Sequence, residues 1–472
     1  MRISGLASNL DWEQLVEQLM QIERRPLLLL ERRKLEIETQ RNAWSDVRSR
    51  IANLRDRVDG VLAQDLFDRV EVKSSDAARV SAEAGSGAAP GTYRVEVQQL
   101  ATAHAIATYS EVTTPANSQN LSGTFTISVT VGAATMASFD VTVDPADSLY
   151  AIRDKINAAV QAAIKANPNL EPYAVRADVI GGYLVITRTE TGAGGIEVSG
   201  AVAEDLKLID NTGAERVVSE GKDAQFKVND VSFTRSSNTV SGVIQGVTLE
   251  LHQAAPGQPV DITVAWDDDA VVDAVKKFIE QYNSTLSFMA QQQDYQAAGG
   301  GKLGGDVLLI TLSNDLRRMV SAPVKALEGS TALDRLAAVG ITTQDKSGTL
   351  QLDEAKLRQA LAADRAGVQR LLAGDPDSAS STDDGVFVRL RKALDGWLQA
   401  NTGLLDQRID SLDERARDYA DQMDRMQYRL QLREQNLTRQ FEALETLLST
   451  LRSQEQWLIQ QVNQLASLRP QR

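Results

Sequence analysis

The chain has 472 residues, of which 42% are hydrophobic and 24% charged, an ordinary balance for a soluble globular protein of about three domains. It contains no cysteine, which excludes disulfides, thiolate catalysis and cysteine metal sites. The net charge is −14, and residues 1–70 carry zero net charge and residues 404–472 carry −1, so the acidic excess lies in the middle of the chain. An acidic middle argues against nucleic-acid binding, which needs clustered Lys and Arg.

Other classes of site are also excluded. The only histidines, His104 and His252, are too few and too far apart to suggest a metal centre or a catalytic triad, and no cofactor is predicted. No run of about eighteen apolar residues could span a membrane. The first residues lack a basic region followed by a continuous apolar core, so we expect no cleaved signal peptide.

The N-terminal region predicts two helices. Asp11 can cap a helix that begins at Trp12, and Pro26 should kink or break it. One face of this first helix is apolar, with Leu15, Leu19 and Ile22. A second helix follows, with apolar residues at seven-residue steps and further ones between them: Leu30, Ile37, Trp44, Val47, Ile51, Leu54, Val58 and Val61.

From about Phe67 to Trp266 the pattern changes to period two, which is typical of half-buried strands. Strands are predicted at 70–73, 93–97, 125–131, 139–143, 184–187 and 260–264. One helix, 148–166, is expected to interrupt them. The glycine-rich stretches between the strands are interpreted as turns, since none has phosphate-loop spacing.

From Asp268 the pattern is helical again. Residues 271–289 predict an amphipathic helix that Asp268 or Asp269 could cap. Residues 306–373 predict helices around a short hairpin at 341–352. Residues 374–385 have the composition of a mobile loop, and a helix is expected at 386–398.

The last segment, 404–468, contains no glycine or proline and predicts one long helix, roughly 90–100 Å at about 1.5 Å per residue. Its apolar seam shifts at Arg433, equivalent to a four-residue insertion, and has one polar gap at Glu455. The seam residues recur at steps of three and four: Ile409, Leu412, Ala416, Tyr419, Met423, Met426, Leu430, Leu437, Phe441, Leu444, Leu448, Leu451, Leu458, Val462 and Leu465.

A single helix cannot bury such a seam against itself, so it needs a partner helix from this chain or from other copies. The simplest interpretation pairs the two ends of the chain; the alternative is a dimeric coiled coil at each end. The expected fold is therefore α+β and multidomain, with the two terminal helical regions paired in a coiled-coil-like leg and a β-rich middle. Six divisions are predicted. Residues 1–67 and 404–472 are the leg helices, and 68–109 and 226–267 are the two parts of an inner β-rich domain. Residues 110–225 form an outer inserted α+β domain, and 268–403 a mainly helical domain.

The candidate site is a partner or oligomer interface along the leg, because apolar seams that need cover are binding surfaces. It comprises Leu15, Leu19, Ile22, Trp44, Ile51, Leu54, Val58, Ile409, Leu412, Met423, Leu430, Leu437, Leu444, Leu451, Leu458 and Leu465.

Motifs along nearly the whole chain occur in a specific order and spacing. They include I-S-G-L-A-S-N-L-D at 3–11, G-T-L-Q-L-D at 348–353 and R-I-D-S-L at 408–412, with further blocks at 16–20, 23–35, 91–100, 226–229, 238–240, 246–249, 263–264, 278–283, 304–306, 339–341 and 403–406. Together they resemble the flagellar filament cap proteins, a family of hook-associated proteins. Asn9 departs from the family's opening motif, which has glycine there.

The resemblance implies a structural protein of the bacterial flagellum, not an enzyme. Its helical termini would form the leg and its inserted β-rich domains a plate. Five or six copies would close into a homo-oligomeric ring at the filament tip. It would promote insertion and folding of exported flagellin, and so motility. Its partners would be other copies, flagellin, the flagellar export machinery and an export chaperone, without nucleic acid or membrane. It would be secreted without a cleaved signal and act outside the cell at the flagellum tip.

Three alternatives remain open from the sequence. The first is a tip-located adhesin that binds mucin or surface glycans through the region 110–225. The second is a hook–filament junction protein, which shares helical termini but fits the motifs poorly. The third is an enzyme or calcium site built from the carboxylates at 267–269 or from Asp375, Asp377, Asp383 and Asp384, which a helix cap and a solvated loop explain better.

Overall fold

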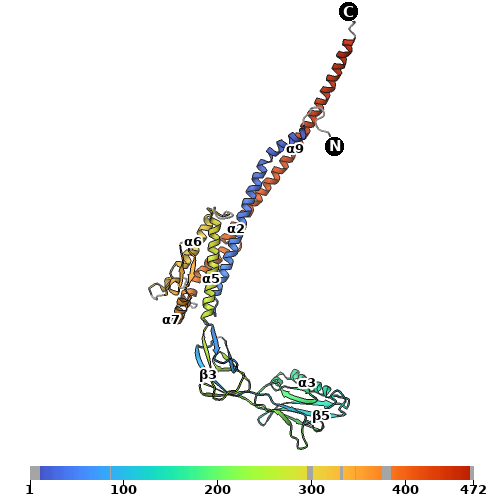
Figure 1. Ribbon diagram of the computed structural model, residues 1–472, viewed down its shortest axis with the longest axis vertical. Coiled ribbons are helices and arrows are strands. Elements are labelled where there is room, and N and C mark those ends of the chain that lie inside the picture. The colour runs from blue at the N-terminus through green and yellow to red at the C-terminus, as the bar shows by residue number, and fades with distance from the viewer. Residues whose placement is uncertain are drawn as a thin grey trace. The chain divides into compact units, whose positions relative to one another are not determined.

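The computed structural model describes residues 11–85, 87–294, 301–329, 333–345, 347–374 and 384–467. They form two compact units, one from the described parts of residues 1–66 and 268–472, and the other from Phe67–Asp267. The first unit is mainly helical, and the second contains the larger β-sheets (Figure 1). This confirms the predicted α+β fold class with paired terminal helices.

The first two helices begin and end for the predicted reasons. Helix α1 is Trp12–Glu23, and the Asp11 carboxylate accepts a hydrogen bond from the Gln14 amide at its N-terminus. Helix α2 is Arg25–Val61, with Pro26 in its first turn, where a missing amide proton costs little. The predicted break at Pro26 is therefore confirmed.

The core of the helical unit lies where α2 packs against α5 (Asp268–Gln293) and α8 (Val386–Leu398). Trp44, Phe278 and Phe387 are almost fully buried there, and the last two rings meet edge to face with centroids 4.6 Å apart. Since each aromatic side chain buries a large apolar area, this cluster makes the junction of the three helices rigid.

Smaller elements complete this unit. Helices α6 (Val307–Ser321) and α7 (Glu354–Ala373) pack on α8, with short 3₁₀ helices at Lys325–Leu327 and Leu336–Val339. The predicted hairpin is confirmed as strands β16 (Ile341–Thr343) and β17 (Leu350–Leu352). The long helix α9, Leu404–Ser467, closes the unit.

The two acidic residues predicted to cap α5 lie inside its first turn instead. Asp268 and Asp269 are the first two residues of the helix, where negative charge is favourable, and they form ion pairs with Arg365 and Arg358 of α7. Of the second carboxylate cluster, residues 375–383 lie outside the described residues, and Asp384 forms an ion pair with Lys392 at 2.6 Å.

The β unit contains two apolar cores. The first, which we name the flanking core, comes from strands before residue 102 and after residue 223. It contains one sheet in the order β1-β15-β3-β11-β12 and another in the order β13-β14-β2. Their bounds are β1 Val70–Ser74, β2 Val80–Ala84, β3 Gly91–Gln99, β11 Ala224–Val228, β12 Val231–Arg235, β13 Thr239–Ile244, β14 Val247–Leu251 and β15 Val260–Trp266.

The second, the inserted core, is built from the residues between. Its sheets have the orders β10-β4-β8-β7 and β6-β5-β9. Helix α3, Leu149–Ala166, buries Ile152, Ile156 and Val160 in this core. The remaining bounds are β4 Ala105–Ala107, β5 Gly123–Val131, β6 Ala134–Val143, a 3₁₀ helix Pro168–Tyr173, β7 Val175–Ile180, β8 Tyr183–Arg188, β9 Gly195–Ser199, α4 Ala201–Asp205 and β10 Arg216–Ser219.

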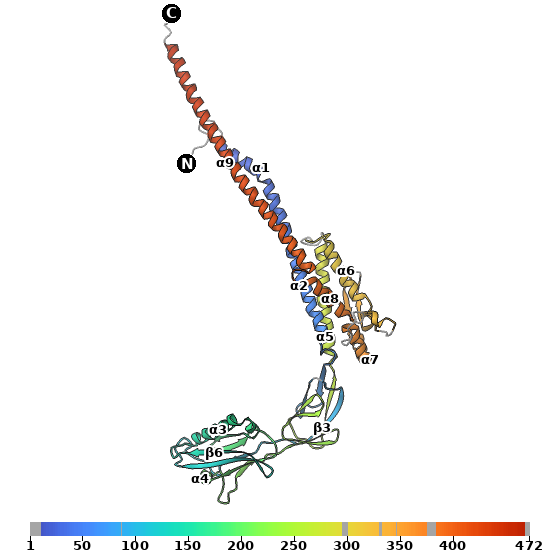
Figure 2. The same ribbon diagram turned by 180° about the vertical axis from the view of Figure 1, so that it is seen from behind.

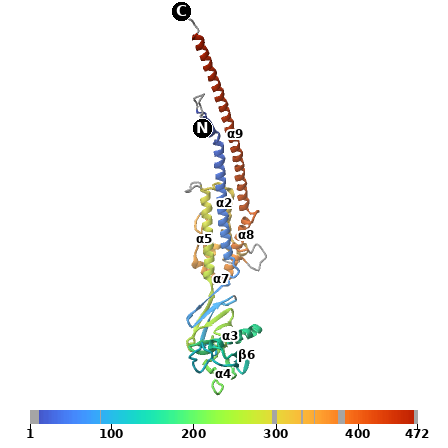
Figure 3. The ribbon, with the colours of Figure 1, turned by 90° about the vertical axis from the view of Figure 1, so that its right-hand side faces the viewer.

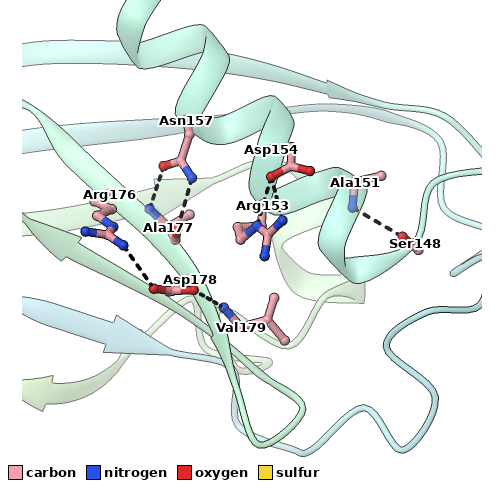
Figure 4. Close-up of polar contacts among 9 residues, drawn as sticks. All are labelled: Ser148, Ala151, Arg153, Asp154, Asn157, Arg176, Ala177, Asp178 and Val179. Atoms are coloured by element: carbon pink, nitrogen blue, oxygen red, sulfur yellow. Dashed lines mark hydrogen bonds and ion pairs between the residues drawn. The ribbon is translucent and has the colours of Figure 1, made fainter.

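Polar contacts attach α3 to its sheet (Figure 4). Ser148 caps the helix by accepting from the Ala151 amide at 3.2 Å, and Asn157 exchanges two hydrogen bonds with the backbone of Ala177, at 2.9 and 3.0 Å. Through this second contact, the Asn157 side chain bonds the backbone of Ala177 as a neighbouring strand would. The prediction of one helix in this region missed α4, which has only five residues and therefore no readable period.

One buried polar group stands out in the helical core. The Tyr282 side chain is fully buried between α5 and its neighbours, and among the described residues its hydroxyl has no hydrogen-bond partner. Burial raises the pKa of this hydroxyl well above its usual value, so the group stays neutral.

We expect Tyr282→Phe to stabilise the protein, because it removes an unsatisfied buried hydroxyl and keeps the ring. The gain should be about 1–3 kcal/mol, measured as the free energy of unfolding in denaturant. Tyr282→Ala, the control, should instead lower stability by about 3–5 kcal/mol because it leaves a cavity. A loss of stability in the Phe variant would show that the hydroxyl is satisfied.

Candidate functional site: the terminal helix pair

Helices α2 and α9 lie side by side and run antiparallel (Figures 1 and 3). Their ion pairs define the direction: Arg48 binds Asp406 at 2.6 Å, and Arg41 binds Asp413 at 3.1 Å. Residue numbers rise on one helix as they fall on the other. These partly exposed pairs contribute little energy, but they select one register.

A buried carboxylate ties this pair to the rest of the helical unit. One oxygen of Asp306 caps helix α6 by accepting from the Leu308 amide at 3.0 Å. The other accepts from Trp44 of α2 at 3.3 Å and from Arg408 of α9 at 2.7 Å. Three helices therefore meet at one side chain, whose exposed fraction is only 10%.

Toward the C-terminus of α9, its partner changes from α2 to α1. Val16 and Met20 of α1 are buried against Leu430 and Leu437 of α9. The rings of Trp12 and Phe441 stack at the end of this contact, 6.4 Å apart and 9° from parallel. Ion pairs also link the two ends of the chain, Glu23 with Arg433 at 3.6 Å and Arg24 with Glu434 at 3.7 Å.

Beyond Phe441, helix α9 continues past the end of α1, and most of its described side chains are exposed (Figure 2). Every described side chain from 451 to 463 is exposed. The seam residues Leu444, Leu451 and Leu458 are 49%, 50% and 54% exposed. The apolar residues beside them are exposed as well: Leu447, Trp457, Ile459 and Val462. Since soluble proteins rarely expose a continuous apolar stripe, this segment has the character of a binding surface.

The predicted interface residues therefore fall into groups. Seven are buried within the chain: Trp44, Ile51, Leu54, Val58, Leu412, Leu430 and Leu437. Ile409 and Met423 are half-buried. Six are exposed: Leu15, Leu19, Ile22, Leu444, Leu451 and Leu458. The side chain of Leu465 lies outside the described residues.

Sequence analysis missed the residues of α1 that contact α9. It selected the face with Leu15, Leu19 and Ile22, but the structure turns Val16 and Met20 inward. The signal was present, since Trp12, Val16 and Met20 recur at four-residue steps. It also missed an open groove of about 650 Å³ near the kink, lined by Pro26, Leu29, Leu30, Arg33, Gln422, Arg425, Met426, Tyr428 and Arg429.

The described residues hold neither a metal-binding cluster nor a membrane-spanning helix. Among the described residues, no group of three or more His, Cys, Asp or Glu side chains is placed to hold a metal ion. Within the same part of the chain, no helix is long and apolar enough to cross a membrane.

Comparison with known proteins gives the assignment. Residues 8–104 match the family described as flagellar hook-associated protein 2 N-terminus, and residues 221–453 match flagellar hook-associated protein 2 C-terminus. The chain is 30% identical over 434 residues to the B-type flagellar hook-associated protein 2 of Pseudomonas aeruginosa, covering 87% of this chain and 86% of that protein.

The chain belongs to the flagellar hook-associated protein 2 family. It is also similar to that protein of Escherichia coli K12, with 26% identity over 481 residues and 97% of each chain covered. The crystal structure of the flagellar cap protein FliD D1-D2-D3 domains from Escherichia coli aligns with a TM-score of 0.57 and 26% identity, covering 79% of this chain and 99% of that one.

Membership of this family makes the protein a structural filament cap of the bacterial flagellum and not an enzyme. None of the matches favours the hook–filament junction protein or the adhesin. The terminal helix pair stays a prediction as the functional site.

We expect Met20→Ala to release α1 from α9, because Met20 is 2% exposed in the small contact between the two helices. Truncation of a buried methionine costs about 2–5 kcal/mol, so amides 12–23 should exchange hydrogen much faster. The matched control is Ile22→Ala on the same helix, where the side chain is 58% exposed and exchange should not change. Equal protection in both variants would contradict this packing.

Proposed function

We propose that this filament cap works as a ring of five or six copies at the filament tip, and that the terminal helices are its legs. The legs dock among the subunits at the open end of the filament, and the β-rich unit provides the plate that covers the end. Exported flagellin is held beneath the plate, folds there and is inserted at the next site. The protein is exported without a cleaved signal, with the help of an export chaperone.

The observation that carries this proposal is the exposed apolar seam of α9 beyond Phe441. Leu444, Leu451 and Leu458 lie at seven-residue steps on one face, the geometry of a helix that packs against another helix. Full burial of a leucine contributes about 1.5–3 kcal/mol, so these half-exposed residues would each add roughly 1 kcal/mol on docking. Such a surface suits other copies of the cap or flagellin.

The covered half of the leg has a different role in this proposal. Trp44, Ile51 and Leu412 are fully buried in their own chain, so they stiffen the base of the leg and are not available to partners. The docking surface is therefore narrower than the full set of seam residues. It consists of the α9 segment 444–462 and the outer face of α1 with Leu15, Leu19 and Ile22. The predicted division at 67/68, 109/110, 225/226, 267/268 and 403/404 remains part of the proposal.

We expect the triple variant Leu444→Gln, Leu451→Gln, Leu458→Gln to abolish stable capping. Glutamine keeps the helix propensity of leucine but removes the apolar seam. The loss should be on the order of 3 kcal/mol per leg, or roughly a hundredfold in affinity. The measurement is complementation of a strain that lacks the cap gene, with motility and unpolymerised flagellin in the medium as readouts.

The control for this experiment changes the opposite face of the same segment. Gln456→Ala with Gln460→Ala alters two exposed polar residues off the seam and should leave motility normal. Secretion of the triple variant is measured in the culture medium, which separates failed docking from failed export. Normal filaments from a well-secreted triple variant would rule out seam docking.

Polar residues in the seam are proposed to keep docking reversible, so that the cap can step as the filament grows. Glu455 interrupts the stripe inside the docking segment 444–462. Arg433 interrupts it before that segment, where it forms a partly exposed ion pair with Glu23 of α1 at 3.6 Å. Arg433→Leu with Glu455→Leu should hold the cap too tightly and shorten filaments, as measured by electron microscopy. Arg439→Leu with Gln456→Leu adds two leucines off the seam as the control. Native filament length in the first variant would contradict the stepping role.

A further inference from the structure

The polypeptide passes twice between the flanking core and the inserted core, and the two passages are bonded to each other. Thr102 and Lys222 form an antiparallel bridge, with N–H to carbonyl distances of 2.9 and 3.1 Å. The Thr102 hydroxyl donates to the Glu220 carbonyl at 2.6 Å, and the Ser219 hydroxyl donates to the Ala103 carbonyl at 2.8 Å. The joint between the two cores is therefore a short two-stranded ribbon.

A loop of the inserted core lies across this ribbon. We name residues 189–194, between β8 and β9, the clasp. The Gly192 amide donates to the Thr102 carbonyl at 3.1 Å, and Gly194 bridges Gly221. The clasp also reaches the flanking-core side, where the Ala193 amide donates to the Asp223 carboxylate at 2.6 Å and the Thr191 hydroxyl donates to the Ser236 carbonyl at 2.6 Å.

The close approach of the clasp requires glycine. Gly192 has a φ of +113°, and a Cβ there would lie 2.7 Å from the Ser236 Cβ. At Gly221 a Cβ would lie 2.3 Å from the Gly194 carbonyl oxygen. Any other residue at these positions would push the clasp away from the ribbon.

His104 holds both ends of the clasp. Its carbonyl accepts from the Arg188 amide at 2.9 Å, just before the clasp, and its ring Nδ1 accepts from the Ile196 amide at 3.2 Å, just after it. An Nδ1 that accepts carries no proton, so this contact needs the neutral ring. The Arg188 side chain is 5% exposed, and its guanidinium donates to the Gly192 carbonyl at 3.3 Å.

The groups around the His104 ring shift its pKa in opposite directions. Burial lowers the pKa of His104, and the charge of Arg188 lowers it further, whereas Glu215 and Glu220 raise it. Glu220 is itself paired with Lys222 at 2.8 Å. Since the folded-state pKa of His104 is depressed, its stabilising contribution is complete above the unfolded value of about 6.5 and is lost as the pH falls below it.

We propose that the clasp locks the inserted core onto the flanking core, and that neutral His104 keeps the lock closed. Protonation of the ring replaces the acceptor at Nδ1 with a donor that faces the Ile196 amide, and it places a second positive charge beside Arg188. The clasp then leaves the ribbon, and the two cores become free to pivot. The cap plate would be stiff in neutral surroundings and flexible in acidic ones.

The absence of cysteine makes a direct measurement possible. Spin labels are attached to the full chain at Gln161→Cys on α3 and Ser232→Cys on β12, both exposed, and the distance distribution is recorded by pulsed electron paramagnetic resonance. Two conditions are compared, about pH 8 and about pH 5, and the lower one lies well below the usual histidine value of about 6.5 because the pKa of His104 is depressed. Neither lies below the sequence isoelectric point of about 4.9, so the chain does not become positively charged.

The native sequence should give a narrow distribution at the higher pH and one about twofold broader at the lower pH, because the lock opens. His104→Asn, whose amide oxygen can accept from Ile196 and does not titrate, should stay narrow at both. The proposal is overturned if the native distribution has the same width at both values, or if the Asn variant broadens as much as the native chain.

A second pair of variants tests the clasp without any pH change. Gly192→Ala and Gly213→Ala both place alanine at a positive φ, +113° and +83°, so their backbone strain is comparable. Only Gly192 lacks room, since a Cβ at Gly213 meets nothing within 4 Å. Gly192→Ala should broaden the distribution at the higher pH and Gly213→Ala should not, while circular dichroism confirms that both are folded. Equal widths in two folded variants would show that the clasp does not hold the joint.

Discussion

The helical unit depends on the burial of one apolar seam, which extends beyond the cover that the described residues of the same chain provide. Helix α9 has seam residues from Ile409 to Val462, whereas α1 and α2 cover it only as far as Phe441. Within the covered part, Trp44, Asp306 and Arg408 join three helices at one buried point. Beyond Phe441, α9 has the apolar face of a buried helix, but this face is exposed among the described residues.

This division of one helix suits a structural filament cap. The covered part is anchored in the helical unit, where Phe278 of α5 meets Phe387 of α8 and α2 packs against both helices. In the proposed function, other chains cover the exposed part. A hydrophobic surface is nondirectional, and in the proposed function the polar seam positions Arg433 and Glu455 keep docking on it reversible.

The β unit has a different constraint. Its two cores are joined by only two passages of the chain, which form a short two-stranded ribbon. A two-stranded ribbon alone is weak, since few hydrogen bonds hold it and its sides are open. The clasp places a third backbone segment against the ribbon. This close approach is possible only because Gly192, Gly194 and Gly221 lack side chains. Glycines that read as ordinary turn residues in the sequence are therefore points of contact between segments far apart in the chain.

Local chemistry made much of the fold predictable. Asp11, Pro26 and Ser148 mark helix ends by rules that act within a few residues, and the helix and strand periods that follow them gave the helical ends and the β-rich middle. The family resemblance came from motifs distributed along the whole chain. Short elements such as α4 were missed because five residues show no period.

The sequence by itself determined that α9 needs a partner along its full length; only the tertiary structure decided which part finds one inside the chain. Leu412 and Leu458 are alike in sequence context, yet the first is fully buried and the second is 54% exposed. The difference arises because the contact between α1 and α9 ends where Trp12, the first residue of α1, stacks on Phe441. Likewise, nothing local to His104 indicates that it holds the clasp, since Arg188 and Ile196 meet it only through the pairing of distant strands.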